Sequence, residues 1–348
     1  MGRYIAKRCV YMIAVFFILT FLLFCLYRLM PSNRAYTDAR TEYQSLKRGL
    51  QDEEDLDAVF NEIYLRYQRM YGTDIDNNFL LYLRWLGAYP LYNGEYNGLF
   101  QGNFGHSYEH NAEVIDIIGD YLRNTIVISL VSEIFVLGIS IPLGIQCAVK
   151  KGKRFDRGVQ FLSLIGFSTP NFVVYIVFIV LFCSILGWFP VSGMHTPGAN
   201  YTGWALVKDT LWHVALPAIC SVFVGLATII RITRASMIDA LSLDCIRTAR
   251  AKGLKEKVVI YSHAWRNALV PMVAIIVGAF FGLIGGSMVM ENMFGFKGMG
   301  SLYLSSLNTQ DYDMIMFIEV IYTFVGLFSG LVIDLAYGLV DPRVRINK

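Results

Sequence analysis

The stretch TIVISLVSEIFVLGISIPLGIQCAV, residues 125–149, carries Glu133 as its single charged side chain. A helix needs about 20 consecutive apolar residues to cross the roughly 30 Å hydrocarbon core of a bilayer. The stretch meets that length, and we therefore predict that Thr125–Val149 spans a membrane. Five further stretches are predicted to span it for the same reason: Val10–Met30, Val159–Gly187, Val214–Ile232, Leu269–Met290 and Met314–Val340.

The composition of the whole chain agrees with a multi-pass membrane protein. Hydrophobic residues make up 55% and charged residues 16% of the 348 residues, and the mean hydropathy is +0.48. A soluble protein needs more polar surface than this to cover its core. The predicted fold class is therefore an all-α membrane protein with six transmembrane helices. Pro142 and Pro170 predict kinks inside two of these helices.

The first apolar stretch follows Arg3, Lys7 and Arg8, as it would in a secretory signal. It is longer than the apolar region of such a signal, and no small-x-small cleavage site follows it. We expect it to be an uncleaved first span, and a cleaved signal is the alternative.

Lysine and arginine concentrate in alternate loops, and this asymmetry predicts the orientation because basic loops stay on the cytoplasmic side. Both termini then face the cytoplasm. We expect the chain to lie in the cytoplasmic (plasma) membrane of a prokaryote. The basic residues that carry this prediction are Lys150, Lys151, Lys153, Arg154 and Arg157, then Arg234, Arg247, Arg250, Lys252, Lys255, Lys257 and Arg266, and finally Arg343, Arg345 and Lys348.

The segment between the first two predicted spans, residues 31–124, is an enlarged loop that this orientation places outside the cell. Acidic residues cluster at 52–57, and apolar residues then recur at helical spacing from Leu56 to Met70, which predicts an amphipathic helix. Glu62 and Arg66 stand four residues apart, as an ion pair on a helix would. Two interpretations of this helix remain open: a cap on the outer surface of the bundle, or a docking site for another protein.

The cytoplasmic loop of residues 234–268, RASMIDALSLDCIRTARAKGLKEKVVIYSHAWRNA, is long and helix-prone, and we expect one break in it, at Gly253. A short helix that lies across the membrane face and ends at a glycine suits docking into a groove of a cytoplasmic partner. An amphipathic loop bound to anionic lipid is the alternative on physical grounds.

Within this loop, IRTARAKGL (Ile246–Leu254) resembles the coupling-loop motif of binding-protein-dependent ABC importer permeases, in the form found in the oligopeptide, dipeptide and nickel branch. Arg247 departs from the glutamate that begins the generic importer motif, and Trp265 replaces a small or aliphatic residue in the match of His263–Pro271 to HALRNALLP. The resemblance implies that the loop inserts into a cleft of a separate ATPase subunit. The residues that would couple to the ATPase are Arg247, Thr248, Ala249, Arg250, Ala251, Lys252, Gly253 and Leu254.

Further stretches resemble the same branch, so that the match covers nearly the whole chain except an apparent insertion at about Ser32–Gly72. It implies a type I ABC importer permease fold, closest to the first (B-type) oligopeptide permease. The domains are then residues 1–30 with the first helix, 31–124 as the outer loop, and 125–348 as the permease core. The matching stretches are GRYIAKR (Gly2–Arg8), YLRWLG (Tyr82–Gly87), GNFGHSY (Gly102–Tyr108), Glu291–Tyr312 and DLAYGLVDPRVR (Asp334–Arg345).

The resemblance further implies that the chain forms half of a translocation path for peptides. Its partners would be a second homologous permease, two ABC ATPase subunits, an extracytoplasmic solute-binding protein and the lipid bilayer, with no nucleic acid. Nickel chelates or other small solutes are the alternative cargo. A stand-alone secondary transporter would need an internal repeat around a midplane site, and a membrane sensor would need a cytoplasmic signalling domain; the sequence displays neither feature.

Two sets of residues in the spans are candidates for the translocation path. Gly278, Gly282 and Gly286 are spaced four apart, which lets helices approach closely in lipid; they either pack within this subunit or line a path beside a sister subunit. Glu133 and Glu319 are costly in a membrane. They could hold a peptide's amino terminus, relay protons, or pair inside the bundle.

The sequence lacks the motifs of an enzyme. It contains no GxxxxGK[ST] phosphate loop, no HExxH and no GxSxG. We expect no catalytic residue, no metal site and no cofactor in this chain, with ATP and Mg bound by the partner subunits. The run GFKGMG (Gly295–Gly300) has the wrong glycine spacing for a nucleotide loop, and we expect a turn on the outer side.

Overall fold

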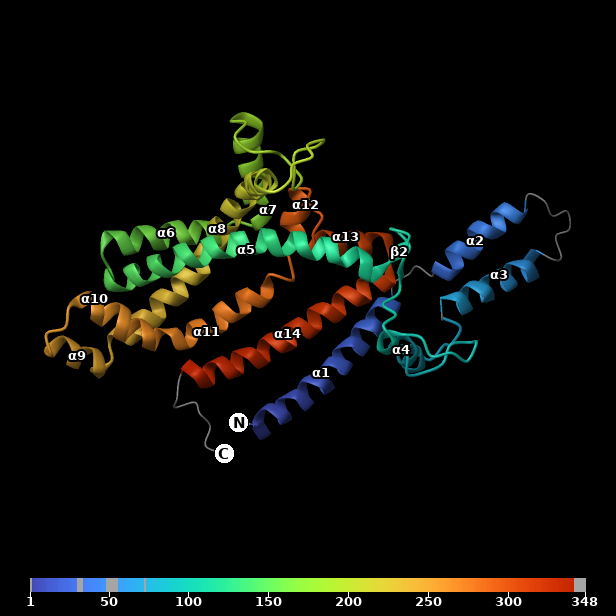
Figure 1. Cartoon of the computed structure of the whole chain (residues 1–348), viewed down its shortest axis with the longest axis horizontal. Coiled ribbons are helices and arrows are strands. Elements are labelled where there is room, and N and C mark those ends of the chain that lie inside the picture. The colour runs from blue at the N-terminus through green and yellow to red at the C-terminus, as the bar shows by residue number, and fades with distance from the viewer. Residues whose placement is uncertain (1, 30–33, 48–55, 72, 341–348) are drawn as a thin grey trace. The chain divides into compact units, whose positions relative to one another are not determined.

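The computed structural model describes residues 2–29, 34–47, 56–71 and 73–340 (Figure 1). Five helices are long and apolar enough to cross a membrane: α1 (Gly2–Arg28), α5 (Val114–Val149), α8 (Trp204–Leu241), the continuous run of residues 256–282, and α14 (Tyr312–Val340). A bent pair of helices makes a sixth candidate span. The predicted all-α membrane class is confirmed, and the chain divides into two compact units.

The first unit contains residues up to 117 together with 305–323. Its elements are α1, α2 (Arg34–Lys47), α3 (Leu56–Met70), α4 (Asn78–Leu86), the short helix η1 (Leu99–Gln101), and a ribbon of β1 (His106–Ser107) paired antiparallel with β2 (Ala112–Glu113). α4 packs on α1, where the buried hydroxyls of Thr20 and Tyr82 lie 2.7 Å apart.

The helix expected at Leu56–Met70 is present as α3, and it packs on α2. The predicted pairing of Arg66 with Glu62 is wrong: Arg66 donates to Glu42 of α2 at 2.5 Å, because the facing helix presents a carboxylate across the hairpin. The Arg66 hydrogen bond also holds the pKa of Glu42 below its ordinary value. The acids at 52–55, the basic C-terminal residues Arg343, Arg345 and Lys348, and parts of the apparent insertion lie outside the described residues.

The second unit contains residues 118–304 and 324 onward, and α8 is its central helix. In Figure 1, α6 (Arg154–Ser168) and α11 (Trp265–Gly282) lie along α8, and both contact it. Close approach depends on glycine: a Cβ on Gly144 of α5 would lie 2.6 Å from Thr233, and one on Gly166 of α6 would lie 2.9 Å from the carbonyl oxygen of Phe223. Glycine-mediated packing therefore occurs against α8.

The third predicted span, Val159–Gly187, is not one straight helix. α6 ends at Ser168, and the chain then bends by 98°. After the bend, α7 (Asn171–Phe178) continues directly into the π-helical segment η2 (Ile179–Ile185). Pro170 at the start of α7 has no backbone N–H and cannot continue α6. The kink predicted at Pro170 is confirmed, whereas α5 continues through Pro142 without interruption.

The fifth predicted span, Leu269–Met290, is wrong at both ends. Helical structure begins earlier, with α10 (Glu256–Val258) and the π-helical segment η3 (Val259–Ala264), and α11 stops at Gly282. Residues 283–287 form a turn, which is followed by α12 (Met288–Met293) and α13 (Met299–Thr309). Apolar composition alone does not distinguish a membrane helix from an apolar turn followed by a short helix, which is why the prediction ran on to Met290.

An ion pair joins the first turn of α6 to α8. The Asp156 carboxylate, 1% exposed, accepts from Arg234 Nε at 2.7 Å and from its terminal nitrogen at 2.8 Å. Gly152 N and Gln160 Nε2 donate to the same carboxylate at 2.8 and 2.7 Å. A buried carboxylate with four donors is well compensated, so this pair fixes α6 against α8.

We expect Asp156→Asn to destabilise the protein by about 3 kcal/mol, because it leaves Arg234 without its buried counter-charge. Thermal unfolding of the purified chain in detergent measures this. Asp239→Asn is the matched control, because Asp239 is an exposed aspartate of α8, the helix that carries Arg234. It should leave the midpoint nearly unchanged. Equal midpoints for both variants would contradict the structural role of the pair.

Candidate coupling site

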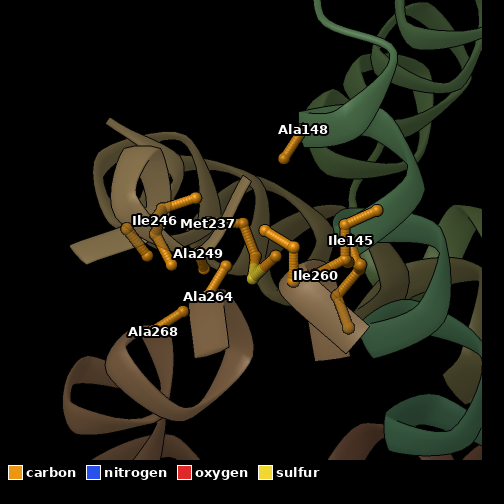
Figure 2. Packing of buried hydrophobic residues seen from close by; sticks show 10 residues of the cluster. Ile145, Ala148, Met237, Ile246, Ala249, Ile260, Ala264 and Ala268 are labelled. Carbon is orange, nitrogen blue, oxygen red and sulfur yellow. The ribbon is translucent and has the colours of Figure 1, made fainter. Parts of the chain in front are cut away.

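The segment that resembles the coupling motif forms a separate short helix, α9 (Asp244–Ala251). Its buried residues, Ile246 and Ala249, stand three apart and so face the same side. Figure 2 shows them packed in one apolar cluster. The other buried members of the cluster come from α5 (Ile145, Ala148), α8 (Met237, Ala240), η3 (Val259, Ile260, Ala264) and α11 (Ala268).

The opposite face of α9 and the turn after it are open to solvent. Seven of the eight predicted coupling residues are exposed there, and Ala249 is the exception, since it belongs to the packed face. Arg247 pairs with Asp244 of its own helix at 3.1 Å. Arg250 holds Glu256, at the start of the next helical run, through two bonds of 2.6 and 3.2 Å. This face is therefore polar and mostly basic.

The turn after α9 depends on Gly253, whose φ of +76° lies in the left-handed region that favours glycine. Gly253 N donates to Arg250 O at 2.9 Å, and Leu254 N donates to Ala249 O at 3.3 Å. The helix break predicted at Gly253 is confirmed. A second break at Ser242–Leu243 was not predicted, so the true loop is shorter than residues 234–268: α8 keeps Arg234–Leu241, and the helical run into α11 begins at Glu256.

The glycines proposed for span five do not share a helix face. Gly278 and Gly282 lie in α11, but Gly286 follows its end with φ +63°. Among the described residues, no atom lies within 4 Å of a Cβ built on Gly278 or Gly282, so no tight packing within this subunit requires them. Their role in a path stays a prediction.

The two candidate glutamates differ in their surroundings. Glu319 of α14 accepts a hydrogen bond from Tyr27 Oη of α1 at 3.1 Å within the first unit. Glu133 is half-buried on α5, and no partner for it is found in the part of the chain that the structure describes. Pairing inside the bundle therefore accounts for Glu319 and not for Glu133. The described residues also contain no group of three or more His, Cys, Asp or Glu arranged to hold a metal ion.

The sequence did not single out Glu291 on α12, which is 1% exposed. Its carboxylate accepts from Thr125 Oγ1 and Ser301 N at 2.9 Å each, and from Ser287 N at 3.4 Å. Burial raises the pKa of Glu291, while these hydrogen bonds oppose the shift. The carboxylate thereby joins Thr125 of α5 to the segment that contains the GFKGMG run, where a turn is present as expected.

Glycines leave the space for this carboxylate. A Cβ on Gly298 would lie 2.5 Å from Cδ of Glu291, and one on Gly286 would lie 2.3 Å from its Oε1. Both distances are shorter than any ordinary Cβ contact. Gly286 therefore leaves space for the Glu291 carboxylate, which differs from the helix packing or path lining predicted for this glycine. In the sequence, the only sign of this buried carboxylate is a glutamate with glycines on both sides, in GSMVMENMFGFKGMG. That sign is not sufficient for a prediction, because the partner Thr125 is far away in the sequence.

These features define a class of protein: a multi-pass helical permease that presents a short, solvent-facing helix between two of its spans. Residues 140–346 match the family of the "Binding-protein-dependent transport system inner membrane component". The chain belongs to this family of ABC importer permeases, and the predicted resemblance is confirmed.

Individual relatives agree. The chain is 35% identical over 275 residues to the oligopeptide transport system permease protein AppB of Bacillus subtilis, covering 79% of this chain and 83% of that protein. It is 38% identical over 249 residues to the peptidoglycan transport system permease protein YejB of Agrobacterium fabrum, covering 70% and 68%. A structure of the MetNI methionine ABC transporter in inward-facing conformations matches 65% of this chain and 97% of that chain, with a TM-score of 0.50 and 16% identity, which supports the fold.

We expect Gly298→Ala to destabilise the protein by about 2 kcal/mol, because the added methyl group overlaps Glu291 and Thr125. Thermal unfolding in detergent measures the change. Gly119→Ala, in α5 where a Cβ meets no described atom within 4 Å, is the matched control. A control variant that loses as much stability as Gly298→Ala would contradict this packing.

The raised pKa of Glu291 predicts a pH dependence. The folded state holds the proton more tightly than the unfolded state, so this contribution to stability is complete at low pH and is lost as pH rises from the ordinary value of 4.5 through the higher folded pKa. We expect the melting temperature of the wild type, measured relative to Glu291→Gln, to fall over that range. A difference that does not change with pH would contradict the assignment.

Proposed function

We propose that this chain is the permease subunit of an ATP-driven peptide importer, in which α9 and the turn at Gly253 receive the movement of a separate ATPase subunit. The observation that carries the proposal is the division of α9 into a packed apolar face and an exposed basic face. The packed face contacts residues of α8 and of the run into α11. A push on α9 therefore reaches the ends of two spans at once.

The partners follow from this role. Two ATPase subunits would bind ATP and Mg, and the chain itself would hydrolyse nothing and hold no cofactor. A second homologous permease would complete the translocation path, with Gly278, Gly282 and Glu133 as candidate lining residues. An extracytoplasmic protein would deliver the cargo. Both termini and α9 would face the cytoplasm of a prokaryote, as the basic loops at Lys150–Arg157 and Arg247–Arg266 favour.

Peptides are the proposed cargo because several relatives, AppB among them, bear the names of peptide permeases. Nickel chelates and other small solutes remain the alternative. Uptake of labelled di- and oligopeptides into vesicles that contain the full complex distinguishes them. Transport of a nickel chelate without any peptide transport would reject the peptide proposal and leave the coupling proposal standing.

We expect Arg247→Glu and Gly253→Val to abolish at least nine-tenths of substrate-stimulated ATPase activity, which corresponds to a loss of about 1.4 kcal/mol or more in coupling. Arg247→Glu reverses charge on the exposed face without touching the packed one. Gly253→Val places a β-branched residue at positive φ and distorts the turn. The assay uses the purified complex in vesicles, with transport measured in parallel.

Arg157→Glu is the matched control, since it makes the same charge reversal at an exposed cytoplasmic-side residue outside this turn. It should keep coupling. Full transport and normal stimulated ATPase activity in both Arg247→Glu and Gly253→Val would refute the role of α9.

A further inference from the structure

A shallow, open groove of about 360 Å³ lies between side chains of the first turns of α8, at the end of this helix opposite α9, and its lining residues all belong to α8. Its lining is largely apolar and consists of Trp204, Val207, Lys208, Leu211 and Trp212. These residues recur at steps of three and four, so they form one face of the helix. The residues Trp204 and Trp212 are 80% and 53% exposed, and Lys208 lies between them in the sequence.

The length of α8 places this groove relative to a bilayer. Residues 210–230 contain no Asp, Glu, Lys or Arg, and Arg231 bounds the stretch at the α9 end. The 1.5 Å rise per residue puts Lys208 about 35 Å from Arg231 along the helix, slightly more than the roughly 30 Å hydrocarbon core. Lys208 therefore lies at the opposite membrane–water interface, at the depth of lipid phosphates. Tryptophan is enriched at this depth.

The charge of Lys208 is not neutralised by its neighbour. Asp209 has its carboxylate, 8% exposed, directed to other groups: Thr196 N and Oγ1 donate to it at 3.0 and 2.6 Å, and His195 and His213 lie nearby. No ion pair or hydrogen bond of Lys208 is found among the described residues. The groove thus combines four apolar side chains with one cation that has no ion pair among the described residues.

We propose that this groove binds a phospholipid of the bilayer leaflet on this side, with the lipid phosphate at Lys208 and an acyl chain along Val207, Leu211 and Trp212. An apolar trough with one cation at phosphate depth complements an amphiphile with an anionic head. Phosphatidylglycerol fits better than phosphatidylcholine, because the choline cation would lie close to Lys208. The tryptophan rings flank the head group at either side.

The test uses the full chain in vesicles of phosphatidylcholine with increasing fractions of dibrominated phosphatidylglycerol, whose bromines quench tryptophan in contact. The quenching that comes from the groove is measured as a difference: the quenching of the wild type minus that of a Trp204→Phe/Trp212→Phe double variant. We expect Lys208→Gln to raise the fraction needed for half-maximal quenching of this signal about fivefold, as for the loss of one exposed ion pair. Lys208→Arg should keep it.

Lys297→Gln removes an exposed lysine of the same unit that does not line the groove, and it should not change the quenching. Unchanged quenching in Lys208→Gln would overturn the proposal. Equal quenching by dibrominated phosphatidylcholine would also overturn it. So would a Lys208→Gln variant that loses a partner subunit when the whole complex is purified while its lipid quenching persists, because a protein would then occupy the groove. These outcomes do not depend on whether the chain transports peptides.

Discussion

Close approach of helices to α8 is the constraint on which the second unit depends. Gly144 and Gly166 bring the backbones of α5 and α6 against this helix at places where any larger residue would overlap it. In a bilayer the hydrophobic effect contributes little to helix association, so the association must be stabilised by packing of small residues and by interhelical polar contacts. The Asp156–Arg234 pair supplies the polar contact at one end of α8. The apolar cluster that anchors α9 forms at the same end.

This arrangement explains how a short helix with few contacts of its own acquires a defined position. α9 has only eight residues and its N-cap residue, Leu243, provides no side-chain hydrogen bond, so it would not be stable in isolation. Ile246 and Ala249 bury it among residues of α5, α8 and the run into α11. The exposed face is then free to vary with the partner, because packing places no demand on it.

The sequence predicted what depends on local pattern and on family resemblance. The membrane class, α3 and the break at Gly253 follow from apolar length, helical periodicity and a glycine between basic helical pieces. α2 was missed because Arg34–Lys47 is polar on average and its two buried residues, Ala35 and Ala39, are small. The end of span five was missed because residues 283–290 are mostly apolar, although they form a turn and the start of α12. Glu291 and Asp156 were missed because their partners, Thr125 and Arg234, are far away in the chain.

The spacing of charges on α8 has a mechanical consequence. The uncharged residues 210–230 extend about 31 Å along the helix, which matches a hydrocarbon core of roughly 30 Å. In a thinner bilayer the excess length is relieved by tilt. Because α6, α11 and α9 are packed against α8 and move with it, the thickness of the bilayer influences the tilt of the second unit. A thinner membrane would increase this tilt from the membrane normal, and a thicker one would decrease it.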